Sequence, residues 1–506
     1  MSPRDKTARA PCGMFGVVEL RGSDMAASVD RRSFLRSAVA AAALAGAPSR
    51  AWASGPQRDG VLDVIVIGAG LAGLTTARDL ARAGNDSFAV LEARERVGGR
   101  TLNHALRNGA WSEVGGQWIG PGQTAVADLA RELEIETFES EYRGRSVYRY
   151  GEGRVTVRTD GEVANEPQLT AELEALARAL PAEQAWNADG AAALDRISLA
   201  DWLDARDARP LDRLTFQIAS ILEMGVSPSR LSLLHFLTMI RCAGSLARLE
   251  AQKDGAQERR FHGGSQLLSI RMAEALGEGV RLGHVVRAIR GWDREVVEVV
   301  TTRGAFRAHS VVMALSPPLC ERIAFSPALP AARRELQRRW PAHAPQMKAA
   351  AIYPSAFWFD AGFNGQVFAV DGPVIWSYDN SPPDHRLGVI NAFLRAGEMP
   401  SDPALAERAV TRVLADSLRD DRLLTPLEFH VQDWGREEFT LSCVSPLPPG
   451  LLTSGLMPAL TDGVGALIWA GSETADVWRG FMDGAVRSGH RAALLALQSL
   501  RSQRRA

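Results

Sequence analysis

The stretch from Val61 to Gly73 constrains the fold more strongly than any other part of the chain. Its first part, Val61–Ile67, is rich in valine and isoleucine, which is typical of a strand buried on both faces. Gly68 then allows a tight turn, Gly70 lets the backbone approach a pyrophosphate, and Gly73 lets the following helix pack closely on the sheet. The sequence therefore predicts a β-α-β unit that binds a dinucleotide.

The residues that follow complete this unit. We predict a helix over residues 71–83, whose first N–H groups, near Leu71 and Ala72, face the phosphates together with the positive end of the helix dipole. A second strand over residues 87–91 ends at Glu92, where a carboxylate accepts hydrogen bonds from ribose hydroxyls. An acid at this position disfavours NADP, because it would repel the 2′-phosphate.

Further segments resemble those of one enzyme family. Residues 92–101 (EARERVGGRT) are similar to the second flavin-contact segment of the flavin amine oxidases, and residues 114–121 (VGGQWIGP) resemble their Gly-Gly-x-aromatic loop. Residues 260–265 and the C-terminal block 468–485 agree with the same family. The order of the motifs is most similar to the monoamine oxidase branch, and the resemblance extends over about residues 61–497.

The resemblance implies FAD as the cofactor and an α/β fold. A Rossmann-like FAD-binding domain, of p-hydroxybenzoate-hydroxylase-like topology, would be joined to a discontinuous α+β substrate domain. Val286 falls where the family makes a backbone contact to the adenine, and the final helix would direct its N-terminal dipole at the flavin pyrimidine. Together with the β-α-β unit, the resemblance assigns these FAD contacts: Gly68, Gly70, Leu71, Ala72, Gly73, Glu92, Ala93, Arg94, Gly99, Arg100, Thr101, Gly116, Gln117, Trp118, Val286, Trp434, Cys443, Gly471, Ser472, Glu473, Gly480, Phe481, Met482 and Ala485.

The chain is predicted to alternate between these two domains. We assign residues 57–141, 251–325 and 431–500 to the FAD-binding domain, and residues 142–250 (helical) and 326–430 (a sheet) to the substrate domain. The active site is expected between the two domains.

Local patterns support this division. Apolar residues at helical spacing predict helices over residues 168–180, 199–203, 211–222 and 231–240. Short apolar runs predict strands over residues 296–300, 310–314, 348–353 and 389–394.

The first 53 residues have the pattern of a targeting segment. Residues 30–36 (DRRSFLR) precede an Ala-rich stretch and then Ala51-Trp52-Ala53, which is typical of a twin-arginine signal with a cleavage site near Ala53. We expect export of the folded, flavin-loaded protein to the periplasm, with Met1 or Met25 as the start. The alternative is a basic arm before an amphipathic helix. The apolar stretch is too short for a stable membrane anchor, and the C-terminus lacks an apolar tail.

Composition excludes other classes of protein. The 506 residues are 46% hydrophobic with a net charge of −1, which fits a large enzyme with a sizeable core and gives no electrostatic footprint for nucleic acid. The four cysteines, Cys12, Cys242, Cys320 and Cys443, show neither metal-ligand nor redox spacing, and no metal site is expected. The sequence leaves the oligomeric state open, a homodimer included.

Lys348 is the catalytic candidate. Residues 347–353 followed by Phe357-Trp358 resemble the family segment whose lysine faces flavin N5 through a water. Strand alternation places Lys348, Ala350 and Ile352 on one face, so a buried Ile352 would carry the lysine inward. An inward lysine would orient water or oxygen and favour a negatively charged oxygen intermediate. The alternative is a surface lysine at the start of a strand.

Two positions depart from the monoamine oxidase pattern. Those enzymes flank the substrate nitrogen with two aromatic side chains, where this chain has Val444 and Phe481. With Trp118, these residues form the predicted substrate pocket, and the missing aromatic favours a bulkier or differently oriented substrate. Cys443 falls where monoamine oxidases attach the flavin 8α-methyl covalently, but in the context Leu-Ser-Cys-Val. A thioether to FAD and a small buried cysteine are equally open.

The implied function is an FAD-dependent amine oxidase. It would remove a hydride from the carbon beside an amine nitrogen to give an imine, hydrolysed to an aldehyde or ketone, and O2 would reoxidise the flavin to give H2O2. Two alternatives stand beside it. The same scaffold could act as an oxidase or dehydrogenase on an amino acid, an N-heterocycle or a C–C bond, or the chain could bind flavin without turnover.

Glu223 interrupts an apolar helix at the predicted domain boundary. It could meet a cationic amine at the entrance of the site. A solvated helix face or an internal salt bridge is favoured instead, so Glu223 is left out of the predicted site.

Overall fold

The computed structural model describes residues 60–106, 109–150, 154–158, 167–344 and 346–503. The predicted signal segment lies outside these residues. The predicted β-α-β unit is present: β1 (Val61–Ile67) leads into α2 (Leu71–Arg82), and β2 (Phe88–Leu91) lies parallel to β1. The α/β class predicted from the sequence is therefore confirmed.

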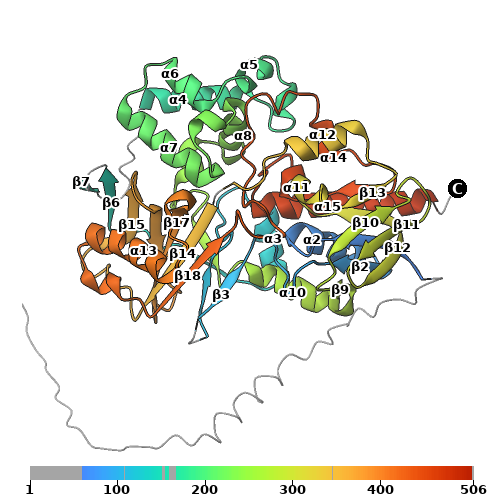
Figure 1. Cartoon of the computed structure of the whole chain (residues 1–506), viewed down its shortest axis with the longest axis horizontal. Coiled ribbons are helices and arrows are strands. Elements are labelled where there is room, and N and C mark those ends of the chain that lie inside the picture. The colour runs from blue at the N-terminus through green and yellow to red at the C-terminus, as the bar shows by residue number, and fades with distance from the viewer. Residues whose placement is uncertain (1–59, 107–108, 151–153, 159–166, 345, 504–506) are drawn as a thin grey trace, which may run out of the picture. The chain divides into compact units, whose positions relative to one another are not determined.

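The β-α-β unit belongs to an eight-stranded sheet (Figure 1). The order is β13-β10-β11-β12-β1-β2-β9, and β19 also pairs with β12. The central strand β1 lies between β2 and β12, which brings chain segments far apart in sequence together. The other strands are β9 (Val280–Arg281), β10 (Val286–Arg290), β11 (Val297–Thr301), β12 (Gly304–Met313), β13 (Ala324–Ser326) and β19 (Leu467–Trp469).

Helices pack on this sheet where small residues allow close contact. The long C-terminal α15 (Met482–Gln503) lies against α2. A Cβ on Gly489 would come within 2.5 Å of the Ala72 carbonyl oxygen, so the two backbones meet only because residue 489 is glycine. α3 (Thr124–Glu132) also packs on α15, and α10 (Gln266–Leu276) packs on α2.

A second, seven-stranded sheet has the order β18-β14-β17-β16-β15-β6-β7. The predicted strands at 348–353 and 389–394 are confirmed as β14 and β17, which pair antiparallel with Lys348 opposite Phe393. α13 (Pro403–Leu418) packs on β15 and β6. The bounds are β6 (Arg145–Tyr150), β7 (Arg154–Arg158), β14 (Gln346–Tyr353), β15 (Phe363–Ala369), β16 (Val374–Asp379), β17 (Gly388–Arg395) and β18 (Glu428–Asp433).

The strands β6 and β7 correct the sequence interpretation, which took the chain as helical from residue 142. β6 pairs parallel with β15, more than 200 residues away. Its strand character depends on this distant partner, which the local pattern does not contain.

The predicted helices of the 142–250 segment are present and share one apolar core. Pro210 occupies the first turn of α7, where its missing N–H costs nothing, and Gly225 ends the helix in the left-handed conformation. The bounds are α4 (Pro167–Ala179), α5 (Ala191–Asp195), α6 (Leu199–Asp204), α7 (Pro210–Met224), α8 (Leu233–Ala243) and α9 (Leu246–Glu250).

Short elements connect these parts. They are the pairs β3 (Asn103–Ala105) with β4 (Trp111–Glu113) and β5 (Thr137–Glu139) with β8 (Arg259–Phe261), and the helices α11 (Pro317–Cys320), α12 (Ala331–Arg339) and α14 (Pro458–Thr461). No helix within the described ranges combines the length and apolarity needed to cross a bilayer.

Candidate active site

A cavity of about 1440 Å³ is lined by residues from both large sheets and from the helical core. Nearly all of the predicted site residues border it, including Val444 and Phe481. Gly73, Trp434 and Lys348 do not. The sequence motifs and the aromatic positions of the predicted substrate pocket therefore meet in one cavity.

The β-α-β turn has the shape that a dinucleotide requires. Gly68 has φ +102°, and a Cβ there would lie 2.8 Å from the Ala314 carbonyl oxygen. A Cβ on Gly70, in contrast, would meet no atom closer than 3.9 Å, so the space beside this glycine is open. Gly70 is also the N-cap of α2 and carries no side-chain cap, which leaves the first N–H groups of the helix available to a phosphate.

The Glu92 carboxylate is fixed by two backbone N–H groups at the position where a ribose is expected. It is 4% exposed, and its carboxylate accepts hydrogen bonds from the backbone N–H of Ala69 (2.8 Å) and of Arg94 (3.0 Å). These bonds fix the carboxylate at the end of β2 while leaving lone pairs toward the cavity. The free N–H groups at the start of α2, the open space at Gly70 and the Glu92 carboxylate fit the pyrophosphate and ribose of FAD.

Two predicted FAD contacts have supporting positions outside the cavity wall. A Cβ on Gly73 would lie 2.0 Å from the Gly68 carbonyl oxygen, so Gly73 serves the close approach of helix and turn. Trp434 is 1% exposed, and its indole N–H donates to the Val114 carbonyl oxygen at 2.7 Å. It anchors the loop that leads to Gly116.

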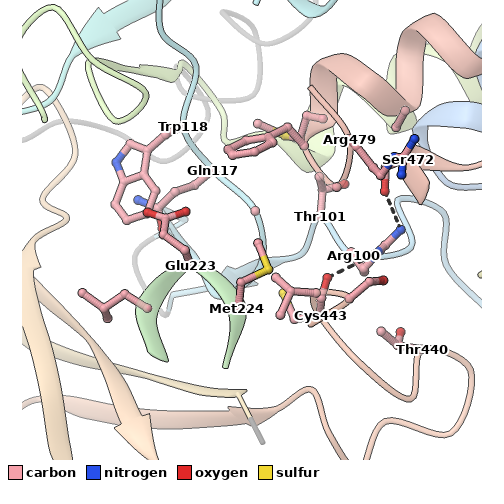
Figure 2. Close-up of a pocket in the computed structure, with 18 of the residues that line it drawn as sticks. Arg100, Thr101, Gln117, Trp118, Glu223, Met224, Thr440, Cys443, Ser472 and Arg479 are labelled. Carbon is pink, nitrogen blue, oxygen red and sulfur yellow. Dashed lines mark hydrogen bonds between the residues drawn. The ribbon is translucent and has the colours of Figure 1, made fainter. Parts of the chain in front are cut away.

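Arg100 ties together three segments of the cavity wall. Its guanidinium donates to the Cys443 carbonyl oxygen (3.1 Å) and the Ser472 hydroxyl (2.9 Å), and it forms an ion pair with Glu473 (2.8 Å). Figure 2 shows the first two of these bonds. Arg94 makes a similar link, donating to Glu437 (3.1 Å). The early and late motifs are thus joined by partly buried, charge-assisted hydrogen bonds.

Lys348 points inward, as strand alternation predicts, since Lys348, Ala350 and Ile352 are all buried. Its Nζ donates to the Gly115 carbonyl oxygen (2.8 Å) and to Gln117 Oε1 (2.7 Å). Burial lowers the pKa of Lys348 to about 7, with Cys443 and Glu113 opposing the shift and Arg260 adding to it.

A buried polar network holds Gln117, which does border the cavity. Gln117 Oε1 also accepts from the Tyr378 hydroxyl (2.9 Å), and its Nε2 donates to Asn380 Oδ1 (2.7 Å). Behind Asn380 lies the ion pair of Arg260 and Glu113 at 2.8 Å, in which both side chains are at most 2% exposed. Lys348 therefore lies just behind the wall and reaches it through Gln117.

Four aromatic rings that sequence analysis missed form one wall of the cavity together with the predicted Trp118. Trp376 stacks on Phe393 with centroids 5.8 Å apart and lies 5.7 Å from Trp118 and 5.9 Å from Phe368. Tyr148 stacks on Phe368 at 4.9 Å. We call these five residues the aromatic wall. The alternation of aromatics within the strands was the available signal, but it does not tell which face meets a cavity.

The two positions that depart from the monoamine oxidase pattern, Cys443 and Val444, also border the cavity. Cys443, Val444 and Phe481 lie in its wall, and burial raises the pKa of the Cys443 thiol while Arg100 and Lys348 oppose the shift. The adjoining Leu441 and Trp478 have φ +62° and +55°. Non-glycine residues in this left-handed region carry strain and cluster at functional sites.

Glu223 corrects the sequence interpretation. Its carboxyl lies neither on a solvated face nor in an ion pair among the described residues, and Glu223 borders the cavity together with Glu250. Burial and the nearby Glu250 raise the pKa of Glu223 to about 8. In Figure 2 Glu223 lies on the same side of the cavity as Trp118, away from Arg100, Ser472 and Thr440.

Within the described ranges, no group of three or more histidine, cysteine, aspartate or glutamate side chains could hold a metal ion. Cys242, Cys320 and Cys443 are free thiols.

Comparisons with known proteins agree with this geometry. The family model for flavin containing amine oxidoreductases matches residues 71–497. A Mycobacterium tuberculosis protein named as a flavin-containing monoamine oxidase (AofH) is 36% identical over 441 residues, covering 85% of this chain and 96% of that protein. The flavin-containing amine oxidase A of Equus caballus is 30% identical over 460 residues, covering 87% and 86%.

Solved structures match over similar lengths. Putrescine oxidase with bound putrescine has a TM-score of 0.80 at 31% identity, covering 86% of this chain and 99% of that chain. Cyclohexylamine oxidase from Brevibacterium oxydans IH-35A has a TM-score of 0.80 at 30% identity, covering 87% and 100%. The resemblance seen in the sequence is thus confirmed, and we conclude that this chain is an FAD-dependent amine oxidase and belongs to the flavin-containing amine oxidoreductase family.

Proposed function

We propose that the enzyme oxidises an amine whose reacting carbon lies between the aromatic wall and the pair Val444 and Phe481, with O2 as the electron acceptor. The single observation that carries this proposal is the continuity of the cavity, which joins the open β-α-β turn at Gly70 to Trp118 and Phe481. When bound, FAD accepts the hydride equivalent and transfers the electrons onward.

The chain's own residues hold the cofactor at defined points. The first N–H groups of α2 and the open space at Gly70 receive the pyrophosphate, and Glu92 receives the ribose. The N-terminus of α15, at Met482, borders the same cavity and places a partial positive charge there.

The aromatic wall favours the neutral form of the reacting amine. Its rings exclude water, and a low-dielectric surface disfavours the ammonium form of the reacting nitrogen. The neutral amine is the form that can lose a hydride from its neighbouring carbon. The absence of a second aromatic at Val444 leaves room for a wider or differently oriented donor.

Lys348 has the role of orienting a water or oxygen through the polar network of the wall. Its Nζ is fixed by Gly115 and Gln117, and with a pKa of about 7 it exchanges a proton near neutral pH. A cation held there stabilises negative charge that develops on oxygen.

Two further proposals concern maturation. Cys443 borders the cavity rather than a closed core, which supports a thioether to the flavin. Acid precipitation then leaves the yellow colour in the wild-type pellet and releases it from Cys443→Ala.

The Arg31-Arg32 motif supports twin-arginine export, and replacing both arginines with lysine should abolish the periplasmic fraction.

The decisive experiment is anaerobic bleaching of the purified flavoprotein with a panel of arylalkylamines, polyamines, cyclic amines and amino acids. We expect one amine class to remove the visible absorbance of the oxidised flavin, and air to restore it with release of peroxide. The proposal is contradicted if dithionite reduces the flavin of the fully loaded protein but no amine in the panel does. The electron donor would then be a compound other than an amine, for which the space beside Val444 leaves room.

A further inference from the structure

We propose that Trp118, Tyr378 and Phe393 form an aromatic cage around the Lys348 amine and act as positioning residues that keep it cationic while oxygen reoxidises the flavin. This inference rests on the proposed function, because it concerns the same lysine. It adds a role in the oxygen half of the reaction for three rings, of which Trp118 and Phe393 also border the cavity.

The cage follows from the register of the second sheet. β14 and β17 pair so that Lys348 lies opposite Phe393, and Phe393 in turn lies opposite Trp376 of β16. Directly paired residues share one face of a sheet, so the lysine side chain stands at the end of a row of aromatic rings. Tyr378 follows Trp376 by two residues on the same face, and the Trp118 ring packs 4.8 Å from the Tyr378 ring.

Three ring faces and two oxygens surround the lysine nitrogen. Nζ lies over the ring of Phe393 at 4.9 Å from its centroid, over that of Trp118 at 5.1 Å and over that of Tyr378 at 5.7 Å. All three distances are within the ~6 Å at which the negative face of a ring attracts a cation. The same nitrogen donates to the Gly115 carbonyl oxygen and to Gln117 Oε1.

The charged groups near Lys348 leave this role to the cage. Burial lowers the pKa of Lys348 to about 7, Arg260 adds to the shift, and Cys443 and Glu113 oppose it. Arg260 and Glu113 form an ion pair with each other, so they act on the lysine with opposite signs. Burial also raises the pKa of the Cys443 thiol, which keeps this group neutral near pH 7.

The other ionisable groups on the elements packed against the lysine are uncharged in the same pH range. Burial raises the pKa of the Tyr378 phenol. On β18 the residue opposite Lys348 is the neutral Gln432. The next side chain on that face is His430, whose pKa is lowered to about 4 by burial and by the stacked His104, and burial lowers the pKa of His104 as well.

The cage suits an ammonium better than a guanidinium. Only three of the 58 basic residues in the chain are lysines, namely Lys6, Lys253 and Lys348. An ammonium is a compact charge that fits between rings and can lose its proton, whereas a guanidinium is planar and stays charged. In the oxygen half-reaction O2 takes up two electrons and two protons and leaves as H2O2, and a cation stabilises the negative charge that first develops on oxygen.

The test is an NMR titration of Lys348 in the purified flavoprotein with isotope-labelled lysine. The three lysines give few signals, and Lys348→Met assigns the relevant one. We expect Phe393→Leu to lower the pKa of Lys348 by about half a unit to one unit, because a cation–π contact of a buried ammonium is lost. Phe393→Tyr keeps a ring and should retain the wild-type value.

Two comparisons separate the charge distribution of the ring from its bulk. Singly and triply fluorinated phenylalanine at position 393 keep the shape of the ring and weaken its negative face, so the pKa of Lys348 should fall with each step of fluorination. Phe429→Leu removes a ring from the opposite face of the same sheet, where Phe429 pairs with Ala351, and should leave the pKa of Lys348 unchanged.

Flavin reoxidation connects the cage to the reaction. The flavin is reduced with stoichiometric dithionite, so the measurement does not depend on an amine, and stopped-flow spectroscopy follows its reoxidation by air against pH. In the wild type the rate should fall as Lys348 loses its proton. In Phe393→Leu this fall should shift to lower pH by the same amount as the pKa, while the rate at pH values below the fall stays within about twofold.

Three results would overturn the inference: an unchanged pKa of Lys348 in Phe393→Leu and in the fluorinated proteins, an equal fall in Phe429→Leu, or a pH profile of reoxidation that does not follow the pKa. If an amine bleaches the flavin and one of these results is found, the inference fails while the proposed function stands. If no amine bleaches the flavin but the pKa and the reoxidation profile shift together, the amine reaction fails while the cage stands.

Discussion

The two ends of the cavity are built differently. At the end of the cavity that carries the cofactor motifs, backbone groups and paired charges form the wall: the open turn at Gly70, the N-terminus of α2, and the Arg100 ion pair with Glu473. At the amine end, isolated side chains from helices and strands line the wall. Glu223 there has no ion pair among the described residues. The two ends thus differ in what forms the wall: backbone groups and paired charges at the first, separate side chains from different elements at the second.

Two buried ionisable groups show the same contrast. Lys348 donates to two acceptors, so its site is complete without the substrate. Glu223 borders the cavity, and no ion pair among the described residues engages its carboxyl. The Lys348 amine is thus held by acceptors of its own chain, whereas the Glu223 carboxyl faces the cavity.

The largest effect should come from Lys348→Met, which removes the buried amine that donates to Gly115 and to Gln117 of the cavity wall. We expect the rate at which air restores the flavin absorbance to fall about a hundredfold, because a preorganised cation is lost. Stopped-flow spectroscopy measures this rate. Anaerobic bleaching by amine in the same variant is the internal control and should fall far less. Equal loss in both half-reactions would assign Lys348 to the amine end instead.

Gly70→Ala tests the flavin end. The added methyl would occupy the open space left for the pyrophosphate, so we expect the Kd for FAD to rise about tenfold to a hundredfold while the protein stays folded. The matched control is Gly397→Ala, whose new Cβ meets no atom within 4 Å. Flavin titration and circular dichroism separate binding from folding. Normal FAD affinity in Gly70→Ala would contradict the proposal that the pyrophosphate lies against this turn.

Val444→Tyr tests the amine end. A second aromatic beside Phe481 should lower KM for arylalkylamines severalfold and raise it for wider amines, because the ring narrows the cavity. Steady-state kinetics on both classes provides the readout, with FAD content as the control. An unchanged ranking of amines would show that Val444 does not face the substrate.

The smallest effect is a pair of opposite pH dependences. Between pH 7 and 10.5 the unfolded chain holds a proton on Lys348 that the folded chain lacks, so this group makes stability rise with pH and lowers it as the pH falls toward 7. Between pH 4.5 and 8 the folded chain holds a proton on Glu223 that the unfolded chain lacks, so this group lowers stability as pH rises. Each slope is at most about 1.4 kcal/mol per pH unit.

Thermal unfolding of wild type, Lys348→Met and Glu223→Gln across these ranges measures the two slopes. The Tm of wild type minus the Tm of Glu223→Gln should become more negative toward alkaline pH, because only the wild type loses stability there, and the Tm of wild type minus the Tm of Lys348→Met should rise over pH 7 to 10.5. Parallel curves would show that neither group has a shifted pKa in the folded state.

The flavin end could be read from the sequence because each of its motifs is a short, contiguous segment, although the motifs themselves lie far apart in the chain. The spacing from Gly68 to Glu92 prescribes a strand, a turn and a helix start, which are local structures with local sequence requirements. Alternation within β14 was also sufficient to turn Lys348 inward.

The amine end could not be read in the same way. β6 becomes a strand through its pairing with β15, and Glu223 faces a cavity because α7 is tied to β14 and packs on β16. Neither contact lies within the range of a local pattern. A polar residue in an apolar helix has the same signature whether it meets solvent or an internal space.

The sequence by itself therefore determined the β-α-β unit and the inward lysine, since these follow from short-range geometry of the backbone, and it indicated FAD and the wider fold through the resemblance of its motifs to one family. The tertiary structure alone decided which of many aromatic and acidic side chains share one cavity with the flavin motifs. The physical reason is that a cavity is a property of packing between distant segments, and the energy of a buried charge such as Glu223 depends on neighbours that only the folded chain supplies.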